Sequence, residues 1–87
     1  MLSLEREREH LAKADRGITD GERRIFAQEL LIKQLHRSGH ETDGAERLLL
    51  TLRQTMEVWR DHRELILQEI ARIERAPRSD AGRRGRD

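Results

Sequence analysis

Histidines and carboxylates are the side chains in this sequence with the most recognisable chemistry. His36 and His40 are four residues apart, a spacing that chelates zinc when both histidines stand on one helix face. Gly39 lies between them and favours a helix end, and no third ligand follows at a defined spacing. We therefore interpret both histidines as solvated loop residues and predict no metal site.

The string Glu7-x-x-His10 matches the pair with which some helical bundles hold metal ions. It occurs once, whereas such sites need repeated copies that face inward, so we interpret the carboxylates as charges that keep helices soluble. The sequence has no glycine-rich phosphate loop, no nucleophile elbow, no HExxH motif and no cysteine. We predict that the protein is not an enzyme and uses no cofactor.

The elements that would position these side chains follow from composition. Charged residues make up 40% of the 87 residues and hydrophobic residues 34%, with Phe26 and Trp59 as the aromatic residues. This is too little apolar mass for a globular core but enough for one narrow seam between helices. Disorder is the alternative for so charged a chain, and the strict apolar periodicity from residue 4 to 73 argues against it.

Net charge and hydropathy limit the partners. The formal net charge of +1 gives no global field that would steer the chain to nucleic acid or to a membrane. No apolar run approaches the roughly 18 residues that a membrane span requires. We expect a cytoplasmic protein without a membrane partner.

Two apolar seams define the expected helices. In the first half, residues recur every seven positions with a second set between them: Leu4, Leu11, Ile18, Ile25, Ile32, and Ala14, Gly21, Gln28, Leu35. In the second half, steps of four and three alternate: Ala45, Leu49, Leu52, Met56, Trp59, Arg63, Ile66, Ile70, Ile73. The pattern predicts an all-α, long antiparallel two-helix hairpin that resembles a coiled coil. Its helices span about 3–37 and 43–75, and the loop is 38–42, where Gly39 ends the first helix and Thr42 or Asp43 caps the second.

Folding the chain about this loop brings the seams together when facing residue numbers add up to about 80 or 81. This register places Trp59, the largest side chain, opposite Gly21, and Arg63 opposite Ile18. We expect the Arg63 guanidinium to reach Asp15 or Glu22. The alternative is that this polar seam residue sets register or partner specificity, and Gln28 invites the same two interpretations.

Gly17 and Gly21 raise the alternative of a break in the first helix. Gly17 would end one helix, and Thr19-x-x-Glu22 has the spacing of a capping box that would start another, giving three helices. The seven-residue phase passes through this stretch without a slip. We therefore favour one continuous helix with a kink or local weakness near Gly17–Gly21.

Some apolar residues point away from the seam and are candidates for binding a partner: Phe26, Leu30, Leu50, Val58 and Leu65. A lone two-helix hairpin buries little surface, and exposed apolar patches tend to be covered by partners. We predict a small protein-interaction or assembly module that self-associates as a homodimer, giving a four-helix bundle, or that binds another helical protein. The alternative interpretation of these residues is scattered surface leucines.

The C-terminal segment 77–87 is predicted to be a disordered basic tail, because Pro77 stops the helix and no apolar seam follows. Its arginines suggest an alternative function as an accessory nucleic-acid-binding protein: Arg78, Arg83, Arg84 and Arg86. Aromatic residues that would stack on bases are absent among them. We prefer the interpretation of a solubilising tail.

Four stretches carry a family resemblance: HLAKADR at 10–16, GERRI at 21–25, SGHET at 38–42 and AERLL at 45–49. They resemble a group of short hypothetical helical-hairpin proteins that are frequent in rhizobial alphaproteobacteria. The likeness covers roughly residues 10–70, and Gly17 and Thr19 depart from the group's pattern at the possible kink. The resemblance implies a bacterial, cytosolic hairpin and transfers no site residue.

Deleting residues 77–87 separates the two functions. We expect partner binding to persist in the deletion variant, because the apolar residues that we assign to binding are retained. A mobility shift of nucleic acid that weakens with salt and disappears on deletion would favour the alternative instead.

Overall fold

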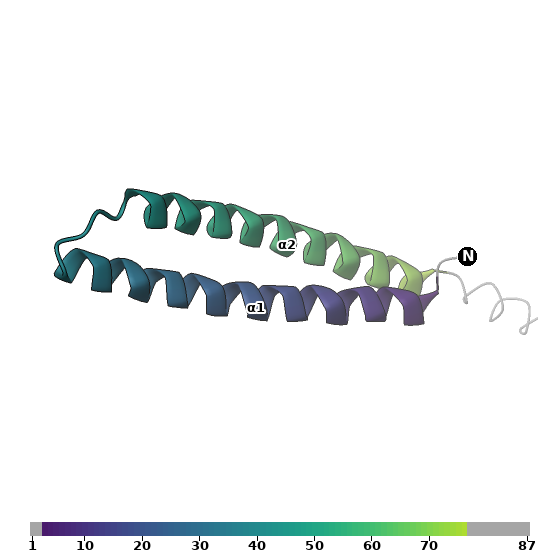
Figure 1. The fold of residues 1–87 in the computed structure, drawn as a ribbon. Coiled ribbons are helices and arrows are strands. Elements are labelled where there is room, and N and C mark those ends of the chain that lie inside the picture. The colour runs from purple at the N-terminus through teal and green to yellow at the C-terminus, as the bar shows by residue number, and fades with distance from the viewer. Residues whose placement is uncertain (1–2, 77–87) are drawn as a thin grey trace, which may run out of the picture.

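Two α-helices make up residues 3–76, the part of the chain that the computed structural model describes. Helix α1 spans Leu4–Arg37 and helix α2 spans Asp43–Arg75. They lie side by side and run in opposite directions, with the connecting loop at one end of the rod (Figure 1). The predicted all-α antiparallel hairpin is confirmed. The predicted tail, residues 77–87, lies outside the described residues.

Both helices begin at a hydroxyl residue. The Ser3 side-chain oxygen accepts a hydrogen bond from the Arg6 backbone N–H at 3.0 Å, which satisfies one of the free donors of the first turn. At the start of α2 the N-cap is Thr42, not Asp43. The Thr42 hydroxyl donates to the Glu46 carboxylate at 2.6 Å, and the Thr42 carbonyl accepts from the Glu46 N–H at 2.8 Å.

Helix α1 ends as Gly39 predicts. This glycine has a φ of 76°, in the left-handed region that residues with a Cβ rarely adopt. Its N–H donates to the His36 carbonyl at 3.1 Å, and the His40 N–H donates to the Leu35 carbonyl at 2.9 Å. These are the two hydrogen bonds of a Schellman motif, which satisfies the last carbonyls of α1 and turns the chain toward α2.

Helix α1 continues without a break through Gly17 and Gly21, so the three-helix alternative is wrong. Neither glycine has a positive φ. Both instead face the other helix: a Cβ on Gly17 would lie 2.9 Å from a ring carbon of Trp59, and a Cβ on Gly21 would collide with the terminal methyl of Met56. The missing side chains on α1 therefore make room for two large ones on α2.

These contacts correct the predicted register. Trp59 lies over Gly17, one helical turn from its predicted partner, and Met56 takes the place over Gly21. Sliding one helix past the other by about one turn keeps both apolar seams in contact, so the periodicity does not distinguish the two registers. In the observed register each glycine accommodates a large side chain, whereas the predicted one used only Gly21.

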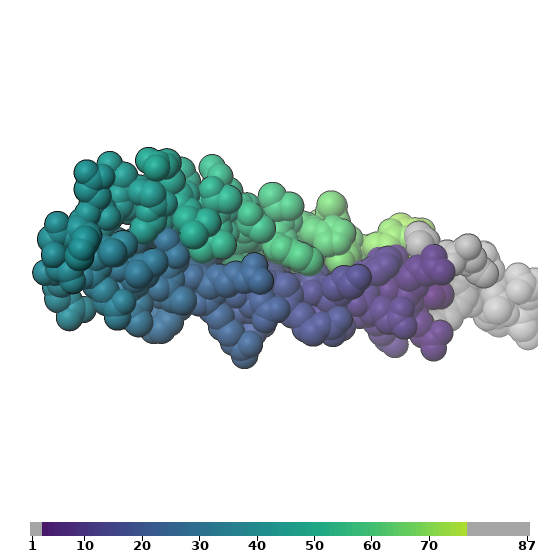
Figure 2. Space-filling model, in the orientation of Figure 1, coloured from purple at the N-terminus to yellow at the C-terminus, as the bar shows by residue number. Residues whose placement is uncertain are grey.

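The core is small. Ala14, Met56 and Ile66 are the buried hydrophobic residues of the described hairpin, and the other seam residues are half-buried. Glu7 is buried as well, because it precedes Ala14 by seven residues and therefore occupies the seam. In the space-filling view the two helices touch along the rod (Figure 2), so the hairpin is a single layer of contact rather than a globule.

The two glycines should respond differently to alanine. We expect Gly21→Ala to raise the free energy of unfolding by about 1 kcal/mol, because alanine is the better helix former and the Met56 methyl can turn aside. We expect Gly17→Ala to lower it by about 1 kcal/mol, because the rigid indole cannot yield as easily. Urea unfolding followed by circular dichroism measures both changes.

The matched control is Gly17→Ala in a Trp59→Leu background. There the indole is gone, and the alanine should become stabilising. If Gly21→Ala proves to be the damaging change and Gly17→Ala the harmless one, the observed register is wrong.

Candidate protein-interaction surface

One side of the hairpin carries four ion pairs between the helices. The pairs are Arg8–Glu74 at 3.4 Å, Asp15–Arg63 at 2.6 Å, Glu22–Arg60 at 3.4 Å and Glu29–Arg53 at 2.7 Å. Their α1 members are spaced by seven residues, which is two helical turns, so they lie on one side of α1. We call this side of the hairpin the charged edge.

The two polar seam residues are satisfied. Nε of Arg63 donates to Oδ1 of Asp15, which confirms the expectation that this guanidinium leaves the seam to reach Asp15 or Glu22. Nε2 of Gln28 donates to the backbone carbonyl of Ala45 at 2.8 Å. Neither side chain leaves an unpaired polar atom in the core, which would be costly.

The other side of the hairpin is hollowed by a groove of about 230 Å³. Its walls come from both helices: Gly17, Asp20, Gly21, Arg24, Leu52, Thr55, Met56 and Trp59. Gly17 and Arg24 each follow a residue of the charged edge by two positions, about 200° around the helix. The groove therefore opens on the side opposite the charged edge, and we call this side the groove face.

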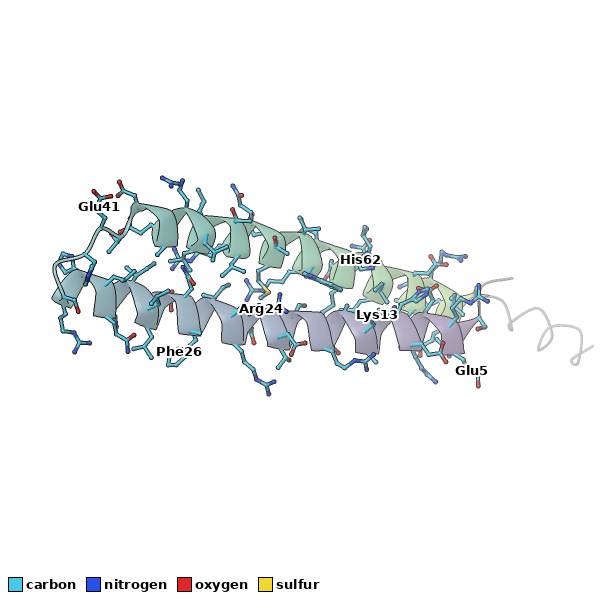
Figure 3. The ribbon with its side chains drawn as sticks, viewed as in Figure 1. Glu5, Lys13, Arg24, Phe26, Glu41 and His62 are labelled. Carbon is cyan, nitrogen blue, oxygen red and sulfur yellow. The ribbon has the colours of Figure 1, made fainter. Side chains whose placement is uncertain are left out.

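The five predicted partner-binding residues are all exposed, but the structure does not bring them together. Phe26 and Leu50 flank the charged edge, since each is three residues before one of its members; Phe26 points away from α2 in Figure 3. Leu30 lies on the outer side of α1. Val58 and Leu65 flank the groove face, being 66% and 62% exposed.

Two exposed leucines were missed in the sequence. Leu31 is 41% exposed and Leu48 is 50% exposed. Leu31 follows Arg24 by seven residues and Leu48 precedes Thr55 by seven, so both lie on the groove face. The sequence contains the information needed to place them. Leu31 follows Glu29 and Leu48 follows Glu46 by two positions, and both glutamates belong to the seven-residue series that flanks the seam on its charged side. Leu31 and Leu48 on the groove face, with Val58 and Leu65 flanking it, give this side of the hairpin four exposed large apolar residues.

Ligand-binding chemistry is sparse along the hairpin. His36 and His40 are exposed near the loop, and Nδ1 of His10 lies 3.7 Å from a carboxylate oxygen of Glu7. Within residues 3–76 no three histidine, aspartate or glutamate side chains come together as a metal site would require. Neither described helix has the length and apolar character needed to cross a bilayer.

Near the C-terminal end of α2, Arg72 donates two hydrogen bonds to the Glu69 carboxylate, at 3.0 and 2.5 Å. These bonds hold the pKa of Glu69 below its ordinary value. The bonds join residues three apart on one helix, so they reinforce its last turns and have no bearing on the partner helix.

No family model, curated protein or solved structure matches this chain. Its surfaces are therefore interpreted from their own physical chemistry. The arginines proposed for nucleic-acid binding, Arg78, Arg83, Arg84 and Arg86, lie outside the described residues.

The charged edge can be tested by charge exchange. We expect Arg53→Glu to lower the free energy of unfolding by about 0.5–1 kcal/mol, because it places a second carboxylate beside Glu29. Adding Glu29→Arg should restore most of the loss at low salt, and the recovery should vanish near 1 M salt, where screening is nearly complete. Equal losses with and without the second change would show that the pair contributes nothing.

Proposed function

We propose that this protein is a small interaction or assembly module that self-associates into a four-helix bundle. The observation that supports the proposal most is the distribution of apolar side chains. Seven large hydrophobic residues of the described hairpin are between 41% and 69% exposed, whereas three hydrophobic residues are buried. A protein that leaves more large apolar groups in water than it buries gains stability when a partner covers them.

The free energy gained when a partner covers these apolar side chains favours association. Fully burying a leucine, valine or phenylalanine side chain contributes about 1.5–3 kcal/mol relative to leaving it in water. Covering even part of the seven exposed residues would add several such contributions to a hairpin that has three buried hydrophobic residues and an otherwise half-buried seam. Pairing two hairpins side by side gives the four-helix arrangement, in which each helix contacts two neighbours.

The kind of organism and the compartment in which the protein acts are proposed from the family resemblance alone. The similarity to hypothetical proteins of rhizobial alphaproteobacteria favours a bacterial cytoplasm and names no process. A second copy is the simplest partner, and a helix of another protein would use the same apolar surfaces.

The oligomeric state tests the proposal directly. We expect light scattering to give a mass near twice the 10.3 kDa of one chain at micromolar concentration, falling on dilution. Leu50→Glu combined with Leu65→Glu should shift the dissociation constant at least tenfold, because each change buries a charge in any interface that covers its side of α2.

The control adds the same two charges at exposed polar positions of α2, as Gln54→Glu with Gln68→Glu. This variant should remain a dimer with unchanged helicity. A molar mass equal to that of a single chain at every concentration tested would contradict the proposal.

A further inference from the structure

We infer that the groove face is the surface covered by a second copy of this chain, and that the two copies run in opposite directions. Their two-fold axis lies in the interface and crosses the rod at right angles at the level of Gly21 and Met56. The inference deepens the proposed function, on which it rests, by naming the face and the arrangement.

The two sides of the hairpin differ in what a partner would have to displace. On the charged edge, four ion pairs join the helices, and covering them would remove water from eight charged groups. On the groove face no ion pair joins the helices within residues 3–76, and four large apolar side chains are exposed. Covering the groove face therefore removes water from fewer charged groups, and buries more large apolar side chains, than covering the charged edge.

The groove face of α2 is complementary to itself when reversed. Its residues follow each other in steps of three and four: Leu48, Thr51, Thr55, Val58, His62, Leu65. Reversing this row about the level of Met56 and Glu57 places Leu48 of one copy opposite Leu65 of the other. The same operation places Thr55 opposite Val58, so no charged side chain meets a like charge along this stretch.

The same axis also determines which residues of α1 face each other across the interface. Because Met56 contacts Gly21, the axis crosses α1 beside Gly21. Reversing α1 there places Arg24 of one copy opposite Gly17 of the other, twice by symmetry. The two Asp20 side chains then lie next to the axis, and Arg24 of each copy is within about one helical turn of the other copy's Asp20. Arg24 takes part in none of the ion pairs of the described hairpin, so it is available for this contact.

The position and size of the face suit a dimer. Gly21 stands at the middle of α1, and Met56 lies three residues from the middle of α2, so an axis there overlaps the two rods along most of their length. Helices of this length are about 50 Å long, and two side by side are about 20 Å wide. Such a face exceeds the roughly 800 Å² per partner that a stable interface buries.

Disulfide trapping tests the arrangement, because the natural chain has no cysteine. We expect a variant with both Leu48→Cys and Leu65→Cys to form a covalent dimer under mild oxidation at least about tenfold faster than either single variant. The two cysteines of one chain are too far apart along α2 to join each other, so each disulfide must link two copies. Mixing the two single variants should restore the cross-link.

The matched control places the same pair on the other side of α2. Leu50→Cys with Glu64→Cys lies beside the charged edge, with the two positions also arranged about Glu57. This variant should cross-link no faster than the single variants. All positions used are exposed, and circular dichroism should show unchanged helicity in each.

The outcomes separate this inference from the proposed function. A dimeric mass with cross-linking in the charged-edge pair, in a single variant alone or in neither pair overturns the face or the orientation and leaves self-association standing. A mass of one chain at every concentration overturns both. Spin labels on Glu41→Cys give an independent readout: the two loops should be about 50 Å apart, whereas copies that run in the same direction would bring them together.

Discussion

The close approach of α1 and α2 at two glycines is the contact on which the rest of this hairpin depends. Trp59 and Met56 are long side chains in the seam of α2, and each lies against a residue of α1 that lacks a Cβ. Had α1 carried branched residues at Gly17 and Gly21, the middle of the rod would be forced apart, because packed interiors do not absorb extra volume cheaply. The ion pairs of the charged edge and the contacts of the half-buried seam form only when the two helices are this close together.

The sequence predicts the elements of this fold well, because helix phase and helix ends are local properties. The seven-residue repeat defines the buried side of each helix, and Gly39 marks the end of α1 through its own backbone preference. Arg63 was expected to reach Asp15 or Glu22, since a long cationic side chain in a narrow seam has acceptors only at its edge, and it reaches Asp15.

The register of the two helices and the division of the exposed residues between two sides could not be predicted from the sequence, for a physical reason. Two seams remain in contact after a slide of one turn, and the choice between registers depends on how Trp59 fits over Gly17, which is a matter of shape. The exposed residues were recognised singly, but their division between two sides requires the position of the second helix. Phe26 and Val58, for example, are both far from the seam, yet Phe26 flanks the charged edge and Val58 flanks the groove face.

The loop at Gly39 also sets the order in which the hairpin can close. The hydrogen bond from Gln28 to Ala45 joins residues 17 apart in the chain, whereas the pair Arg8–Glu74 joins residues 66 apart. Closing the longer segment from an open chain costs about 1 kcal/mol more in entropy. Contacts between the two helices therefore form first near the turn and then progressively toward their free ends. Fraying follows the reverse path, so amide hydrogens near Ser3 and Ala76 should exchange with solvent before those beside the turn.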